Sequence, residues 1–348
     1  MLASHLFRLL AVSLTVITTV EGAADVNKFF SRYWPGKDTD NGCKAHAKDL
    51  ADSYTEASKL IDAAVDAISY LKGNKKPSAL KLKDRWNWDR QAKAMLSMFG
   101  IKISKDGGPE DESRDNFEFV EKASIFFKTF GIFGQMQDGM KNDQASMRGP
   151  PGLYCGVKAW KHYKPDDTSP LDPTKKISDD KTVDGKARWP QGLMAEGQTS
   201  ENHNLCGDKV YAFTVAPLTI ITFCDYIWEA DNVVKSLDVD GAKEFDHLGI
   251  KERNSLSLTW VHELAHFYGS YPSGGLPDQQ AVDENGKPVK DAKGNPVKTY
   301  GVMYVLNLGK ADADRASRTA DAFAWFAMAM YYSKFDWSKG FAQAYHLM

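Results

Sequence analysis

Apolar side chains recur at helical spacing through the first part of the chain. In residues 43–72 they form one stripe with a period of about 3.6 residues, which predicts a long amphipathic helix. The stripe consists of Ala47, Leu50, Tyr54, Ala57, Ile61, Ala64, Ile68 and Leu71. A second helical stretch follows over residues 86–99, and residues 117–130 return to helical spacing after a charged, glycine-rich loop over 105–115.

Strand-like runs come later in the chain. Residues 206–224 contain two β-rich runs joined by a turn at Ala216-Pro217, which predicts a β-hairpin. Residues 148–204 are dense in Pro, Gly, Asp and Lys with little periodicity, so we expect long loops with short strands there. Apolar residues after Asp321 indicate a closing helix. The pattern as a whole predicts an α+β fold that is mainly helical with a small β-hairpin sheet.

Another helix, which carries polar residues of a catalytic type, is expected between the hairpin and the closing helix. Residues 258–269 read Leu-Thr-Trp-Val-His-Glu-Leu-Ala-His-Phe-Tyr-Gly and contain an HExxH motif. One helical turn separates His262 from His266, so both rings share a face and can bind one metal ion, with Glu263 beside it. The apolar flanks predict a buried helix, and a core seldom accepts His, Glu and His without partners. A helix that carries satisfied core histidines is the alternative.

The chemistry of a zinc hydrolase explains these residue types. Catalytic zinc takes three protein ligands and keeps a fourth position for water, whose pKa falls toward about 7 on binding. Glu263 would accept a proton from that water and later deliver it to the leaving amine. We therefore expect one Zn²⁺, bound by His262 and His266, with Glu263 as the general base.

The start of the chain and its overall charge narrow the functional class. Residues 1–23 carry Arg8, an apolar run and small residues, a pattern typical of a secretory signal peptide. No later run is apolar enough for a membrane span, so we expect a secreted, extracellular protein. We also expect it to be a monomer. The formal net charge of -2 argues against nucleic acid or an anionic membrane as the partner. Residues 24–348 are expected to form one domain, with a helical part (24–145), a loop-rich insertion (146–205) and a zinc-site part (206–348).

The cysteines number four, which suits two disulfides in an exported protein. The predicted hairpin would bring Cys206 and Cys224 together at its ends. By elimination the other bridge is Cys43–Cys155. The other possible pairings of the four cysteines stay open at this point.

These stretches together resemble the aspzincins, the deuterolysin-like family of secreted fungal zinc endopeptidases. In that family a Cys-bounded hairpin precedes HExxH, a G-T-x-D segment with an aspartate ligand, Tyr-Gly, and a final helix that opens Asn-Ala-Asp. The matching stretches here are residues 206–228, 262–266, 275–278, 300–301 and 319–327. The resemblance covers residues from about 200 to 335 and only loosely the helices before them. It implies a zincin-like metalloprotease fold and a protein or peptide substrate.

The resemblance also implies that an aspartate is the third zinc ligand. Asp278 follows His266 by nearly the family interval, although Leu276 stands where the family has Thr. Residues 279–299 form an insert before Tyr300 where the family has very few residues. We expect Asp278 to be the ligand, with Asp283 in the insert as the alternative and Asp291 as an exposed turn residue.

Three further positions follow from the same resemblance. Tyr300 matches the family tyrosine whose hydroxyl lies near the zinc and can donate to the oxyanion, and a packing tyrosine is the alternative. Asp321 matches an aspartate behind or beside the zinc and is assigned to the substrate pocket. In the lysine-specific branch a glutamate stands three residues later, but here that residue is Ala324, so strict lysine specificity is not expected.

The sequence thus predicts a secreted zinc endopeptidase that hydrolyses peptide bonds with metal-activated water. Two other classes of function stay open. One is a zinc-binding protein without catalysis, and the other is a secreted, effector-like interaction protein on a peptidase scaffold.

Overall fold

The computed structural model describes residues 24–26, 43–110, 117–141, 152–156, 166–168, 172–179, 206, 209–216, 220–229, 237, 246–248, 255–269 and 276–344. The predicted signal peptide, residues 1–23, lies outside these residues, as does most of the loop-rich stretch 146–205. Within the described part of the chain, none of the helices combines the length and the apolar character that crossing a membrane requires.

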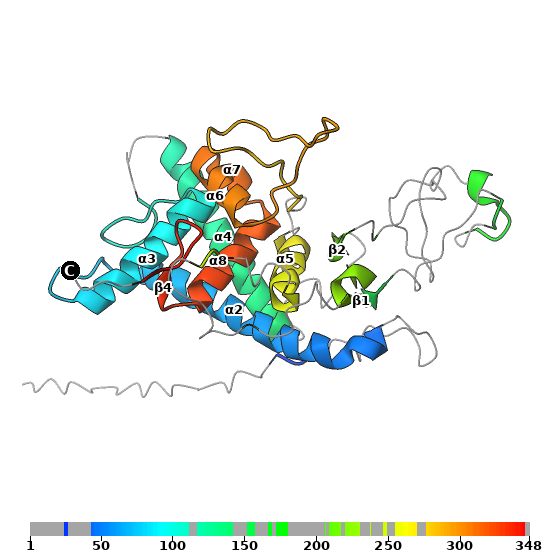
Figure 1. Ribbon diagram of the computed structural model, residues 1–348, viewed down its shortest axis with the longest axis horizontal. Helices are drawn as coiled ribbons and strands as arrows, with labels where there is room; N and C mark the ends of the chain where they lie inside the picture. The colour runs from blue at the N-terminus through cyan, green and yellow to red at the C-terminus, as the bar shows by residue number, and fades with distance from the viewer. Residues whose placement is uncertain are drawn as a thin grey trace, which may run out of the picture.

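Helices make up most of the described structure, and the longer ones pack side by side (Figure 1). These are α2 (Ala47–Gly73), α3 (Leu82–Phe99), α4 (Phe117–Lys141), α5 (Leu256–Gly269), α6 (Val302–Ala311) and α8 (Ala320–Tyr331). Shorter helical turns are η1 (Cys43–His46), η2 (Ile177–Asp179), η4 (Asp225–Trp228) and α7 (Ala313–Ala316). The apolar stripe predicted for residues 43–72 is buried along α2 from Leu50 to Leu71, and Ala47 alone of the stripe is exposed.

Two helices differ from the prediction. Helix α4 continues to Lys141 instead of ending near residue 130, because its later glycines dilute the apolar pattern without breaking the helix. Gly139 is needed there, since a Cβ at that position would collide with the phenol of Tyr268 on α5. Helix α6 was not predicted, although Val302, Val305 and Leu308 are buried at helical spacing.

The predicted hairpin is present but belongs to a larger sheet. Strands β2 (Ala212–Val215) and β3 (Ile220–Phe223) pair antiparallel, and β1 (Gly152–Cys155) pairs parallel with β3 on its other side. The order is therefore β1-β3-β2, which leaves β2 at one edge. A second, two-stranded sheet joins β4 (Phe335–Asp336) to β5 (Gln343–Ala344) near the C-terminus.

The two disulfides tie the sheet to the helices and to itself. Cys43, at the start of η1, is bonded to Cys155 at the end of β1, with a Cα–Cα distance of 4.9 Å. Cys206 is bonded to Cys224, directly after β3, with a Cα–Cα distance of 5.3 Å. The first bond links the beginning of the long helix to the edge of the sheet opposite β2.

Helix α5 occupies the centre of the molecule, between the other helices and the sheet (Figure 1). It packs against α2 and α8 on one side and β2 on the other. Its fully buried Trp260 contacts Tyr54 of α2 and Phe223 of β3 at ring-centroid distances of 5.1 and 4.6 Å, and its Nε1 donates to Ser53 Oγ at 3.2 Å. Removal of a buried side chain this large costs about 3–5 kcal/mol. The helix that carries the HExxH motif is therefore fixed by the core.

Candidate metal centre

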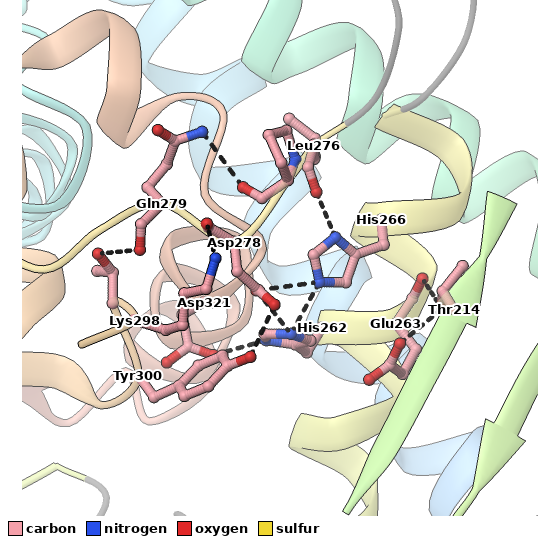
Figure 2. A network of polar contacts seen from close by, with 12 residues as sticks. Thr214, His262, Glu263, His266, Leu276, Asp278, Gln279, Lys298, Tyr300 and Asp321 are labelled. Carbon is pink, nitrogen blue, oxygen red and sulfur yellow. Dashed lines mark hydrogen bonds and ion pairs between the residues drawn. The ribbon is translucent and has the colours of Figure 1, made fainter. Parts of the chain in front are cut away.

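Three side chains converge at the open face of α5. His262 and His266 project from the same side of the helix, with their Nε2 atoms 3.0 Å apart. Asp278 Oδ1 lies 3.3 Å from His266 Nε2 and 3.7 Å from His262 Nε2 (Figure 2). Among the described residues, these three form a group of His, Cys, Asp or Glu side chains close enough to share one ion.

The spacing of these atoms suits zinc. Ligand atoms at about 2.0–2.1 Å from a tetrahedral zinc ion lie about 3.3 Å from one another. The distances among His262, His266 and Asp278 are 3.0, 3.3 and 3.7 Å, which bracket that value. Two imidazoles and one carboxylate also leave a fourth position open, as in catalytic zinc sites.

The opposite nitrogen of each ring is held by the protein. His262 Nδ1 lies 2.6 Å from Asp321 Oδ1, and His266 Nδ1 donates to the backbone carbonyl of Leu276. With Nδ1 as the donor in both rings, Nε2 is the atom of each that would bind a metal ion. Such outer hydrogen bonds fix the tautomer and orientation of metal-binding histidines. The arrangement thus fits a metal ion at the two Nε2 atoms.

Asp321 is held in place from three directions. It lies in the first turn of α8, where its Oδ2 accepts hydrogen bonds from the backbone N–H of Gly301 at 2.6 Å and from Trp325 Nε1 at 3.2 Å. Its Oδ1 contacts His262. Asp321 lines the pocket beside the candidate metal centre, and both of its carboxylate oxygens bond to the protein.

Electrostatics at the site favour a cation. Burial alone would lower the pKa of His262, but the hydrogen bond and charge of Asp321, together with Glu263 and Asp278, raise it to about 9. Burial would raise the pKa of Asp278, yet His266 and His262 hold it well below its usual range. The carboxylates around the two rings therefore produce a negative environment that a metal ion would neutralise.

Tyr300 contacts the same aspartate. Its hydroxyl donates to Asp278 Oδ2 at 2.7 Å, and its ring centroid lies 6.0 Å from that of His262. Partial burial and the charge of Asp278 raise the pKa of Tyr300 above its ordinary value, so the phenol keeps its proton. With its ring half exposed, Tyr300 lies beside His262 and Asp278 and keeps a proton to donate.

Glu263 is buried on the side of α5 that faces the sheet. Thr214 of β2 places its Oγ1 at 2.5 Å from Glu263 Oε2, and the backbone carbonyl of Glu263 is farther from it, at 3.2 Å (Figure 2). The hydroxyl therefore donates to the carboxylate and leaves Oε1 unconstrained by this contact. Sequence analysis did not identify Thr214, and no local pattern could have done so, because the contact joins residues 49 positions apart.

The insert of residues 279–299 closes on itself at its base. Thr299 N donates to Gln279 O at 2.8 Å, and Lys298 Nζ donates to Asp278 O at 3.1 Å. Farther out, Ala281, Val289 and Val297 form a ring of three backbone hydrogen bonds, each donating to another member. Arg315 of α7 donates from its guanidinium to the backbone carbonyl of Gln280 at 2.6 Å, which attaches the start of the insert to α7. This closed stem brings Asp278 and Tyr300 together.

The two aspartates of the insert lie in turns. Asp283 Oδ1 accepts from the backbone N–H groups of Asn285 and Lys287, and Asp291 Oδ1 accepts from those of Lys293 and Asn295. Neither belongs to the group that could hold an ion. Of the three aspartates considered as the third ligand, the structure brings Asp278 alone to the Nε2 atoms of His262 and His266.

Leu276, where the resemblance expects a threonine, contacts the site through its backbone. Its contribution to the site is its backbone carbonyl, which accepts from His266. Its side chain is buried against the end of α5, where a Cβ on Gly269 would collide with it. A leucine can therefore occupy this position without loss of the contact to the histidine.

The chain shows similarity to known proteins at the level of structure. No family model matches the chain, and no curated protein matches it. Among solved structures, the chain is similar to a zinc peptidase from Grifola frondosa, with a TM-score of 0.37 and 13% sequence identity over 82% of this chain and 96% of that chain. A similarity of this extent carries no conclusion about activity, so function has to be inferred from the side chains of the site.

Proposed function

We propose that this protein is a secreted zinc-dependent endopeptidase of the aspzincin type. The observation that supports it is the converging set of His262 Nε2, His266 Nε2 and Asp278 Oδ1, with both Nδ1 atoms anchored and the fourth position open. Structural histidine pairs do not need this orientation. Beside these three residues, the carboxylate of Glu263 can transfer protons and the phenol of Tyr300 can donate a hydrogen bond to the oxyanion.

Zinc bound at His262, His266 and Asp278 would supply a positive charge that polarises the substrate carbonyl and lowers the pKa of water. Glu263 carries out the proton transfers, first accepting a proton from water and then donating it to the departing amine nitrogen. The hydroxyl of Thr214 holds Oε2 of this carboxylate, which orients Oε1 for the transfer.

Tyr300 and Asp321 support the reaction in different ways. Tyr300 keeps its proton and can donate a hydrogen bond to the oxygen on which negative charge develops. To do so its hydroxyl must turn away from Asp278 Oδ2, its partner at 2.7 Å. Asp321 fixes the ring of His262 and raises the basicity of its Nε2.

The test is hydrolysis of an unfolded protein such as casein by the purified mature protein. We expect turnover that a zinc chelator abolishes and added zinc restores. The variant Glu263→Gln should keep its zinc, and its kcat should fall by about 10²–10⁴-fold. Glutamine matches glutamate in shape but cannot accept the proton. Absence of cleavage by zinc-loaded wild type between pH 4 and 9 would favour the alternative of an inactive zinc-binding or interaction protein.

A further inference from the structure

A pocket of about 380 Å³ opens beside the metal centre. Its volume lies within the range of about 300–1,000 Å³ that is usual for pockets that bind small molecules. The segment 209–211 and the start of β2 form one wall, the first turns of α5 form another, and α8 contributes Trp325. The lining side chains outside the catalytic group are mostly apolar, among them Val210, Tyr211, Ala212, Leu258 and Trp325.

The pocket is continuous with the reacting groups. Leu258 and Thr259 lie one helical turn before His262 and Glu263, and all four residues line it. A side chain in the pocket would therefore belong to a residue close to the bond that is cut.

The acidic groups of the pocket are already engaged. Asp321 bonds through Oδ1 to His262 and through Oδ2 to the N–H groups of Gly301 and Trp325. Glu263 Oε2 accepts from Thr214, and its Oε1 is the oxygen assigned above to proton transfer. An ammonium group placed beside Asp321 would have to compete with the bonds that this carboxylate already makes to the protein, and a buried cation that lacks a carboxylate partner is disfavoured.

The positive charge of Lys209, at the rim of the pocket, also disfavours a basic substrate side chain. Lys209 is exposed, lines the pocket and has a φ of 68°, which a lysine rarely adopts. The left-handed backbone at this residue sets the course of the chain into β2. A cation at the rim repels a basic substrate side chain and has little effect on a neutral one.

We infer that this pocket selects substrates with an uncharged apolar or aromatic side chain next to the scissile bond and disfavours lysine and arginine there. This inference rests on the proposed function, because it assigns a specificity to that peptidase site. The apolar walls provide the attraction, whereas the charge of Lys209 and the bonded carboxylate of Asp321 provide the discrimination.

The test uses peptides that differ in one central residue, Phe, Leu, Lys or Arg. Binding to zinc-loaded Glu263→Gln is measured by calorimetry, and cleavage of the same peptides by the wild type is mapped by mass spectrometry. We expect the Phe and Leu peptides to bind at least tenfold more tightly than the Lys and Arg peptides, with the same order in the cleavage rates.

Charge reversal at the rim provides the second measurement. Lys209→Glu should reduce the ratio of Phe to Lys peptide binding several-fold, whereas Lys293→Glu, in an exposed turn of the insert, should leave it unchanged. Equal binding of all peptides, a preference for Lys, or no peptide bound at all overturns the inference. If the wild type cuts nothing while Glu263→Gln binds Phe and Leu peptides preferentially, the pocket specificity stands and the peptidase proposal fails.

Discussion

His262 Nδ1 and Asp321 Oδ1 lie 2.6 Å apart, although 59 residues separate them in the chain. The pair joins the middle of α5 to the first turn of α8. A carboxylate in this position orients a metal-binding histidine and raises its basicity without touching the metal. The contribution of Asp321 to zinc binding can therefore be measured separately from those of the ligands.

We expect Asp321→Asn to weaken zinc binding by about 10–100-fold, because asparagine keeps the shape but loses the charge that stabilises the His262 N–H. Affinity is measured by competition with a chromogenic chelator. Asp314→Asn is the matched control, since Asp314 lies on the surface of α7 and pairs with Arg318. Equal zinc affinity in the two variants would exclude this role for Asp321.

Substitution of the aspartates one at a time identifies the third ligand. Asp278→Ala should lose most of the bound zinc, because it removes one of the three ligand atoms. Asp283→Ala and Asp291→Ala should retain zinc at the wild-type level, since both side chains cap turns of the insert. Elemental analysis after dialysis provides the measurement. Full retention of zinc by Asp278→Ala would show that another group completes the site.

The contact between Thr214 and Glu263 predicts a defect in turnover without a defect in metal binding. A hydrogen bond to a charged group is worth about 1.5–3 kcal/mol, so Thr214→Val should lower kcat by about 10–100-fold. Thr214→Ser keeps the hydroxyl and should restore most of the rate. Zinc content and KM should change little in either variant. If valine and serine give the same kcat, Thr214 does not position the base.

The disulfides predict a measurable loss of stability. Removal of Cys206–Cys224 with the double substitution Cys206→Ser and Cys224→Ser should lower the free energy of unfolding by about 3 kcal/mol, since the bond closes a short loop. Urea denaturation of zinc-loaded protein gives the value. Peptide mapping without reduction should recover Cys206–Cys224 and Cys43–Cys155, and a fragment joining Cys43 to Cys206 or Cys224 would contradict the pairing.

The elements predictable from the sequence are those specified by local spacing. The stripe in α2 and the positions of His262 and His266 both follow from the helical repeat, which a single segment contains. The hairpin of β2 and β3 was predictable for the same reason. Short strands were expected within residues 148–204, where β1 lies, but its pairing with β3 was not predictable, because a parallel pairing joins distant segments and leaves no signal in either.

At the site too, contacts between distant segments could not be predicted from the sequence. Asp278 could be chosen over Asp283 from its interval after His266, but the sequence kept both open. Thr214, the carbonyl of Leu276 and the anchoring by Arg315 depend on tertiary contacts and had no signature. The backbone carbonyl in particular could not be predicted, because any residue type supplies one.

The ring of backbone hydrogen bonds among Ala281, Val289 and Val297 separates the outer turn of the insert from the site. Beyond it, the turn that ends at Gly294 has no neighbouring atoms within 4 Å of where a Cβ would lie. Additional length in a surface loop costs little, about 0.6 kcal/mol for each doubling. A fluorophore or an affinity tag can therefore be grafted at this turn, and substitutions there can accumulate in evolution, without displacing Asp278 or Tyr300.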